Sequence, residues 1–196
     1  IEMQLGSGGS KATVGIDFKA NFLKSMQLYG QLAISEFVFK EIRNYSRGSW
    51  MNKQALQLGA KYIDVAGINN LDLQVEMNLV RPFMYTHNDS NTAFVHYNKE
   101  LAHPLGANFG EYLAVLKYQP IPRLYLTGKL MYYKQGLDSM GVNMGNDLFR
   151  SYLTRPREYG FHIGTGIPAK QFLASFSASY ELLQNLYIDL NIAQRN

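Results

Sequence analysis

Residues 71–119, LDLQVEMNLVRPFMYTHNDSNTAFVHYNKELAHPLGANFGEYLAVLKYQ, contain the clearest indication of the fold. The first nine of these residues alternate strictly between apolar and polar side chains, from Leu71 to Leu79. Successive side chains of a β-strand point to opposite faces, so this period predicts a strand with one apolar and one polar face. The chain then passes Pro82 into a segment rich in Asn, His and Tyr and returns as a second strand near Phe109. Long strands joined by a connection of roughly 20 residues are typical of transmembrane β-barrels.

The same alternation recurs along the chain. It predicts strands near residues 12–23, 25–36, 54–64, 71–86, 109–119, 123–135, 158–168, 171–182 and 186–194. Long connections are expected at 37–53, 87–108 and 136–157, and the other connections are short. Outer-membrane barrels alternate in this way, with the long loops outside the cell. We therefore predict an all-β fold in which residues 1–196 are part of one antiparallel transmembrane β-barrel. This barrel is larger than the chain, has an even strand number of up to about 18, and belongs to a longer polypeptide.

The composition is compatible with this fold. Apolar residues make up 46% of the chain, the mean hydropathy is −0.20, and no apolar run reaches the length of a membrane helix. Barrel strands produce such values because half of their residues face a polar interior. Fourteen Tyr and eleven Phe against a single Trp are expected where rings gather at membrane interfaces. The predicted location is the bacterial outer membrane, with the loops at the cell surface.

Several function classes are excluded or disfavoured. The absence of cysteine excludes disulfides, thiolate metal sites and Cys nucleophiles. The net charge of +4 comes from scattered Lys and Arg with no basic run, so nucleic acid is not an expected partner. No GxSxG motif is present, and the chain is predicted to be non-enzymatic and to need no cofactor.

The four histidines do not predict a metal site. His87, His96 and His103 are separated by 9 and 7 residues, which matches no familiar ligand spacing. Residues 88–91 would offer oxygen ligands to calcium, although an Asx-rich turn is the simpler interpretation.

Polar side chains on the strands fall on one face. The predicted lumen-lining residues are Asp72, Gln74, Glu76 and Lys129. Carboxylates and cations at such positions are interpreted as an ion-pair network of the barrel interior rather than as catalytic groups. The same polar face supports an alternative function, a porin-like diffusion channel.

The predicted outer loops carry aromatic rings among Asn, Asp, His and Arg. The glycan-binding candidates are Tyr45, Trp50, Phe94, His96, Tyr97, Asn98 and Tyr152. Flat rings cover the C–H faces of sugars, and amides bond to hydroxyl groups. The alternative is an aromatic girdle with loops packed against one another.

Several segments carry a family resemblance. They are LYGQLAISEF (28–37), QLGAKY (57–62), RPFMYTH (81–87), HYNKELAHPLGANFGEY (96–112), KYQP (117–120) and YYKQGLD (132–138). Together these segments cover most of residues 26–138 and resemble the Wzi-like capsule-assembly outer-membrane proteins, in the branch found in gliding Bacteroidota. The resemblance implies surface polysaccharide (capsule or lipopolysaccharide) and outer-membrane lipid as partners. The gliding branch implies a role in motility and adhesion, and a structural subunit of a motility or secretion complex is a further alternative.

Overall fold

The fold is all-β. The computed structural model describes all residues except 1–12, 37–44, 89–92, 94, 98 and 140. One antiparallel sheet contains β1 (Val14–Phe22), β2 (Met26–Glu36), β3 (Lys53–Tyr62), β4 (Leu71–Val80), β7 (Phe109–Ile121), β8 (Leu124–Leu137), β9 (Ile167–Leu183) and β10 (Leu186–Arg195). A separate small hairpin is formed by β5 (Val95–His96) and β6 (Lys99–Glu100), and three short 3-10 turns are η2 (Tyr45–Arg47), η3 (Val65–Gly67) and η5 (Tyr152–Thr154). The predicted antiparallel all-β class is therefore confirmed.

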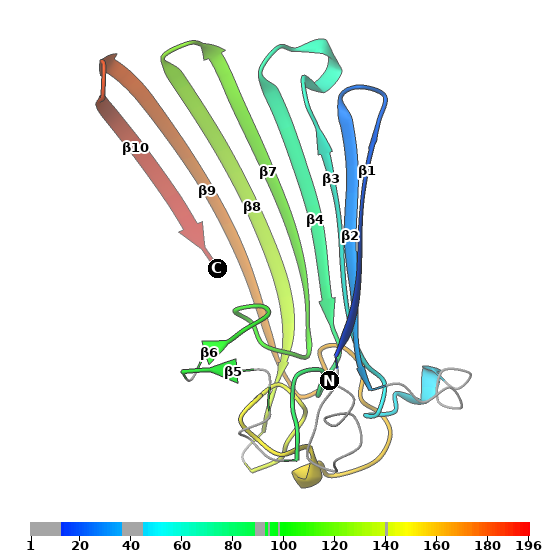
Figure 1. Ribbon diagram of the computed structural model, residues 1–196. Coiled ribbons are helices and arrows are strands. Elements are labelled where there is room, and N and C mark those ends of the chain that lie inside the picture. Colours follow the sequence, from blue (N-terminus) through cyan, green and yellow to red (C-terminus); the bar gives the residue numbers. More distant parts are fainter. Residues whose placement is uncertain (1–12, 37–44, 89–92, 94, 98, 140) are drawn as a thin grey trace.

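The sheet is a meander. Its spatial order, β1-β2-β3-β4-β7-β8-β9-β10, is the order along the chain, and β1 and β10 are its edges (Figure 1). The connections 23–25, 63–70, 122–123 and 184–185 are short and lie at one end. The connections 37–52, 81–108 and 138–166 are long, and their described residues lie at the other end, at the bottom of Figure 1. The predicted alternation of short and long connections is thus present, with each long connection differing in its bounds.

The strand predicted at 158–168 is wrong. Gly160, Gly164 and Gly166 adopt positive φ angles of 83°, 85° and 124°, which a strand does not accommodate. Between them, the Phe161 N–H donates to the carbonyl of Gly48 in the first long connection, at 2.9 Å. These residues therefore belong to the third long connection, and the main sheet has eight described strands instead of nine.

The strand predicted at 71–86 also ends earlier, at Val80. Residues 82–85 form a turn, in which Phe83 has a φ of 64°. Proline at position 82 lacks the N–H that a continuing ladder needs. The second long connection therefore begins at Arg81, and it includes the β5–β6 hairpin that the alternation did not predict.

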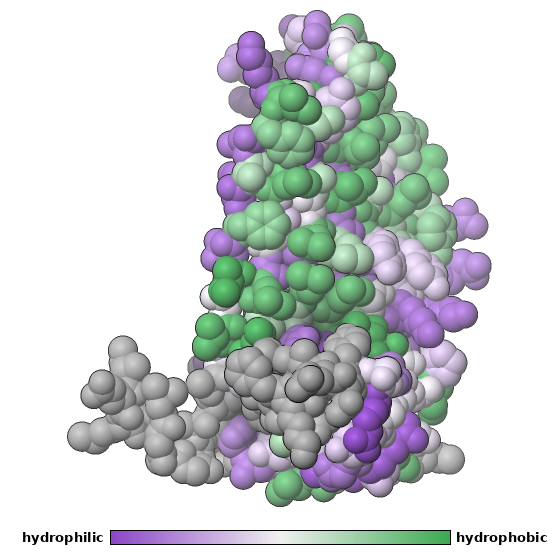
Figure 2. All heavy atoms as spheres, turned by 90° about the vertical axis from the view of Figure 1, so that its right-hand side faces the viewer, coloured by the Kyte–Doolittle hydropathy of each residue, from purple (hydrophilic) through white to green (hydrophobic). Residues whose placement is uncertain are grey.

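The two faces of the main sheet differ in chemistry. Cross-strand partners share a face, so the register places the outward residues in rows across the sheet. One row contains Phe18, Gly30, Leu58, Met77, Tyr112, Tyr132 and Phe172. We call this side the apolar face and the opposite side, which carries Glu76 and Lys129, the polar face. Leu130 is 51% exposed and Phe172 44% exposed on the apolar face, and Figure 2 shows apolar side chains gathered along the height of the sheet.

The buried core lies among the long connections and not along the sheet. We call the described residues of 45–52, 81–108 and 138–166, with the adjoining strand ends, the loop cap. One cluster in it contains Val80, Met84, Tyr85, Ala107, Phe109 and Leu148, and a second contains Trp50, Phe83 and Phe161. Burial raises the pKa of the Tyr85 phenol to about 12. The loop cap is thus the folded layer that fixes the geometry of the long connections.

Candidate functional site

Trp50 lies at the centre of the loop cap. Its ring contacts Phe83 edge-on, with centroids 6.3 Å apart, and Tyr152 at 4.9 Å. Phe83 in turn meets Phe161 edge-on at 5.0 Å. These four rings come from all three long connections, and edge-to-face pairs add to the stabilisation from burial. The rings therefore hold the three connections together.

Charged groups surround the Trp50 ring. Its indole Nε1–H donates to Glu158 Oε2 at 2.6 Å, and Arg155 pairs with the other Glu158 oxygen at 2.6 Å. The Arg155 guanidinium also lies over the Trp50 ring, 3.9 Å from the centroid. The hydrogen bond from Trp50, followed by that from Arg155, lowers the pKa of the Glu158 carboxyl. The fully buried Lys53 ammonium lies 4.2 Å from the Tyr152 ring centroid, on the same cluster.

These contacts correct the expectation that Trp50 is a free platform for sugars. Its side chain is only 8% exposed, and Tyr152 is half-buried against it. The sequence places Trp50 in an irregular, polar segment, which suggested exposure. Its partners Phe83 and Phe161 fall within 71–86 and 158–168, where alternation predicted strands, so no signal in the sequence indicated that these rings pack against Trp50.

The buried side chains of Arg81 and Asn108 link the long connections through hydrogen bonds to backbone groups. Arg81 is almost fully buried, and its Nε donates to the Asn52 carbonyl at 2.7 Å, while its Nη2 donates to the carbonyls of Ser49 and Phe161 at 3.2 and 3.1 Å. Asn108 is also fully buried. Its Nδ2 donates to the carbonyls of Gly136 and Thr165 at 2.8 and 2.7 Å, and its Oδ1 accepts from the Gly164 N–H at 2.8 Å. Buried backbone groups outside a sheet need such partners, and both residues supply them.

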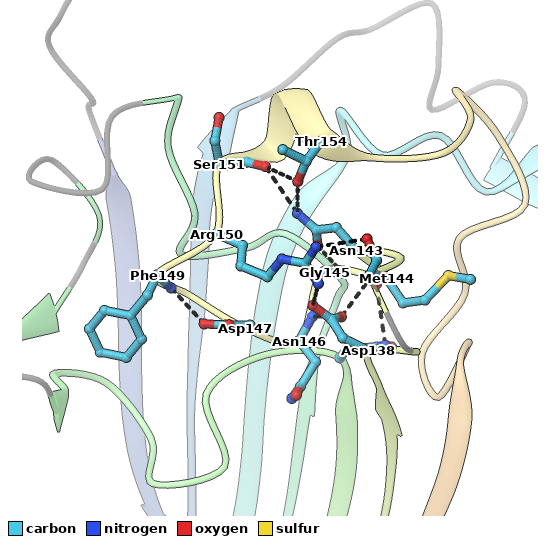
Figure 3. Close-up of polar contacts among 12 residues, drawn as sticks. Asp138, Asn143, Met144, Gly145, Asn146, Asp147, Phe149, Arg150, Ser151 and Thr154 are labelled. Atoms are coloured by element: carbon cyan, nitrogen blue, oxygen red, sulfur yellow. Dashed lines mark hydrogen bonds and ion pairs between the residues drawn. The ribbon is translucent and has the colours of Figure 1, made fainter.

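The third long connection has its own polar framework (Figure 3). Asp138 accepts from the Met144 N–H at 2.8 Å and pairs with Arg150 at 3.3 Å. Asn143 donates to the Ser151 carbonyl at 3.0 Å and to Thr154 Oγ1 at 2.9 Å. These bonds close the segment from 138 to 154 on itself, so the loop cap presents a defined surface.

The most exposed candidate is in the β5–β6 hairpin. Tyr97 is 88% exposed, and the His96 ring meets it edge-on with centroids 4.3 Å apart. Tyr97 has a φ of 46°, which places it at the turn of the hairpin. Phe94, Asn98 and the side chain of Tyr45 lie outside the described residues. Among the described members of the predicted glycan-binding set, His96 and Tyr97 are the pair whose rings are exposed to solvent.

The polar face carries a connected hydrogen-bond network centred on Glu76. Tyr29 donates from its hydroxyl to Glu76 Oε2 at 2.6 Å, and Gln57 donates to Oε1 at 3.0 Å. Gln74 donates to the Tyr29 hydroxyl at 2.9 Å. The Tyr29 ring crosses Gly59 on the intervening strand, where any side chain would collide with it. Glycine at position 59 is therefore required for this bridge across β3.

The network continues to the second long connection. Asn78 Nδ2 donates to both Glu76 and Glu111 at 3.0 Å. His103 Nε2 lies 3.1 Å from Glu111 Oε2, while its Nδ1 accepts from the Leu105 N–H at 3.2 Å. Because Nδ1 is an acceptor, the neutral imidazole carries its proton on Nε2 and donates it to Glu111. The hydrogen bond from His103 to Glu111 thus holds this part of the second long connection against the polar face.

The structure places the four predicted polar residues on this same face. Gln74 and Lys129 share one cross-strand row through Val115. Asp72 lies two positions away, and its Oδ1 accepts from the Asp64 N–H at 3.3 Å in a short connection. Glu76 is the centre of the network described above. Alternation along the sequence also places Tyr29 and Glu111 on the polar side of their strands, but it does not identify His103, from the second long connection, as a member of the network.

A cavity of about 420 Å³ lies between the polar face and the second long connection. Its lining includes Gln31, Gln57 and Asn78 from the sheet, with Tyr85 and His103 from the loop cap. The lining offers amide groups and an aromatic ring but few charges. It is a space in which a neutral polar ligand would find donors and acceptors.

Two further searches concern the described residues alone. No group of three or more His, Cys, Asp or Glu side chains among them is arranged to hold a metal ion. None of the helices formed by these residues has the length and apolar character that crossing a membrane requires.

Comparison of the sequence with protein-family models and with curated proteins finds no match. Function is therefore inferred from the two faces of the sheet and from the loop cap.

Proposed function

We propose that this chain is part of an outer-membrane β-barrel whose apolar face contacts lipid and whose polar face lines the interior. The observation that carries the proposal is the exposed apolar face of a single sheet. A water-soluble domain covers such a face with a second layer of structure, whereas a lipid bilayer covers it directly. The loop cap then lies at the cell surface, because long loops of bacterial barrels are extracellular.

The dimensions support this arrangement. On β4, the apolar positions run from Leu71 to Leu79, and on β8 from Leu124 to Tyr132. Each run contains nine residues, which is within the length of about 9–11 residues that a tilted strand needs to cross a bilayer. The lipid-facing band of such barrels is bordered by aromatic residues. The row that contains Tyr112, Tyr132 and Phe172 lies at the long-connection end of this band, where an aromatic border is expected.

For the activity itself, we propose non-enzymatic attachment or handling of surface polysaccharide, or support of adhesion. The exposed His96–Tyr97 pair supports this function, because it presents two rings on a hairpin next to a closed loop cap. Binding to such a prearranged surface costs little ordering entropy. The resemblance to Wzi-like capsule-assembly proteins and their gliding branch supports the same function.

The test is a variant in which His96 and Tyr97 are both alanine. The expected result is release of polysaccharide from intact cells, or loss of adhesion, with unchanged barrel abundance in the outer membrane. Leu153→Ala is the matched control, because Leu153 is also highly exposed in the loop cap but has no ring. Normal polymer retention in the double variant would favour a channel or a scaffold instead.

A diffusion channel is a second candidate, favoured by the charged network on the polar face. Glu76 and Glu111 would then border the permeation path. Bilayer conductance separates the two functions: a channel is expected to show ion flow whose selectivity shifts towards anions in Glu76→Gln. Absence of conductance in the full-length protein would exclude the channel and leave polysaccharide handling or a structural role.

A further inference from the structure

We propose that Lys134 and Lys170 form a binding site for the phosphate group of an anionic lipid at the edge of the apolar face. The inference rests on the proposed membrane arrangement and adds a specific lipid partner to it. Neither residue belongs to the polysaccharide or channel sites described above.

The two lysines are direct cross-strand partners on β8 and β9. Like charges directly opposite one another destabilise a sheet unless something of opposite charge lies between them. Both side chains are exposed, and in the described part of the chain neither forms a salt bridge with a carboxylate. An anion between the two ammonium groups would remove this repulsion.

The stem of Lys134 has a defined path. It passes beside Gly164 of the third long connection, where an added Cβ would lie 3.0 Å from Lys134 Cε. Gly164 has a φ of 85°, so the backbone there depends on glycine. The other cross-strand neighbour of Lys134 is Gly110, and the space over it is occupied: an added Cβ there would lie 3.2 Å from Leu79 Cδ2 and 3.8 Å from Ile163 Cγ2. The lysine stem is thus bordered by packed groups rather than free to sample all directions.

The place of the pair on the sheet selects a lipid over a soluble anion. The next outward row towards the short-turn end contains Tyr132 and Phe172, about 7 Å away. The row after it contains Leu130, which is half exposed. An amphiphile with its phosphate at the lysines would lay its acyl chains over these apolar side chains. A free phosphate would gain only the two charges.

The experiment uses the full-length protein in phosphatidylcholine nanodiscs that contain lipid A with two phosphates or its dephosphorylated form. Each lysine near an anionic headgroup contributes about a five-fold change in binding. Lys134→Gln combined with Lys170→Gln is therefore expected to bind the phosphorylated lipid about 25-fold more weakly. The corresponding pair of arginine substitutions should retain binding, and Lys117→Gln, on the polar face, is the matched control.

Three results would overturn the inference. They are equal binding of the dephosphorylated lipid, binding by the double Gln variant within two-fold of the parent protein, and displacement of the lipid by millimolar inorganic phosphate, which would indicate a soluble anion. A full-length protein that does not enter the bilayer would instead overturn the proposed function, and the lipid site with it.

Discussion

Replacement of Leu130 by arginine tests the proposed membrane arrangement most directly. Leu130 lies on the apolar face of β8, next to the row that contains Tyr132, and is 51% exposed. For a face in water, a change at such an exposed position alters the free energy of unfolding by no more than about 0.5 kcal/mol. For a face in lipid, the cost of arginine falls from about 2–4 kcal/mol at the midplane to about 0–1 kcal/mol at the interface. At Leu130, one row inside the Tyr132 border, the expected cost is about 1–3 kcal/mol. The two environments therefore predict results that differ by several-fold in size.

The matched control is Ser177→Arg on the neighbouring strand β9. Ser177 lies on the polar face, opposite Thr127 and Asn191, so the new charge meets no cation directly across the sheet. Its cost is expected to stay within about 0.5 kcal/mol. Both variants add the same side chain within the predicted lipid band, three cross-strand rows apart, and they differ in the face that receives it.

The measurement is equilibrium unfolding of the full-length protein from phosphatidylcholine vesicles by guanidinium chloride. Leu130→Arg should lower the unfolding free energy by about 1–3 kcal/mol relative to Ser177→Arg. Equal stability of the two variants would refute the assignment of lipid to the apolar face. A larger loss in Ser177→Arg would reverse the assignment of the faces.

Further predictions concern the loop cap and the polar network. Trp50→Ala should destabilise the cap by about 3–5 kcal/mol, seen as faster proteolysis within the long connections, whereas Trp50→Phe should be milder; unchanged cleavage would contradict the packing argument. Because the pKa of Glu158 is lowered in the folded protein, its contribution to stability is present above the ordinary value of 4.5 and is lost as the pH falls through the folded pKa. Emission from Trp50, the single tryptophan, should therefore be constant above pH 4.5 and change only below it; Glu158→Gln should abolish that step. Gly59→Leu should displace the Tyr29 ring and lower the free energy of unfolding by denaturant by about 1–3 kcal/mol. Unchanged stability would show that the Tyr29–Glu76 hydrogen bond does not require glycine at position 59. Tyr97→Ala should change stability by less than about 0.5 kcal/mol, which separates its role in binding from any role in folding.

Alternation along the sequence predicted most of the sheet because period-two patterns survive wherever one face meets apolar surroundings and the other meets polar ones. The same signal failed at 158–168, where apolar residues alternate with Gly160 and Gly164 but the backbone turns at each glycine. Periodicity describes side chains, whereas the φ angles at these glycines decide the path of the chain.

The loop cap was less predictable for a different reason. Whether Trp50 is exposed depends on Phe83 and Phe161, which lie far from it in sequence and reach it only after three connections have folded together. No local sequence pattern encodes these contacts between distant segments. The polar face was predictable as a set of residues, but the bridge from Tyr29 to Glu76 depends on cross-strand register, which alternation alone does not fix.

The meander order has a consequence for how the sheet is assembled. Every strand of the main sheet pairs with the strand that precedes it in that sheet, and the β5–β6 hairpin lies outside the sheet between β4 and β7. Hairpins can therefore add one after another, each using the free edge of the previous hairpin as a template, with no crossing of the chain. At every stage the growing sheet has an unpaired edge that is able to recruit a wrong strand. Correct assembly thus requires the next hairpin to pair with this edge before a wrong strand does. The short turns form fastest, so they set the order in which strands are added.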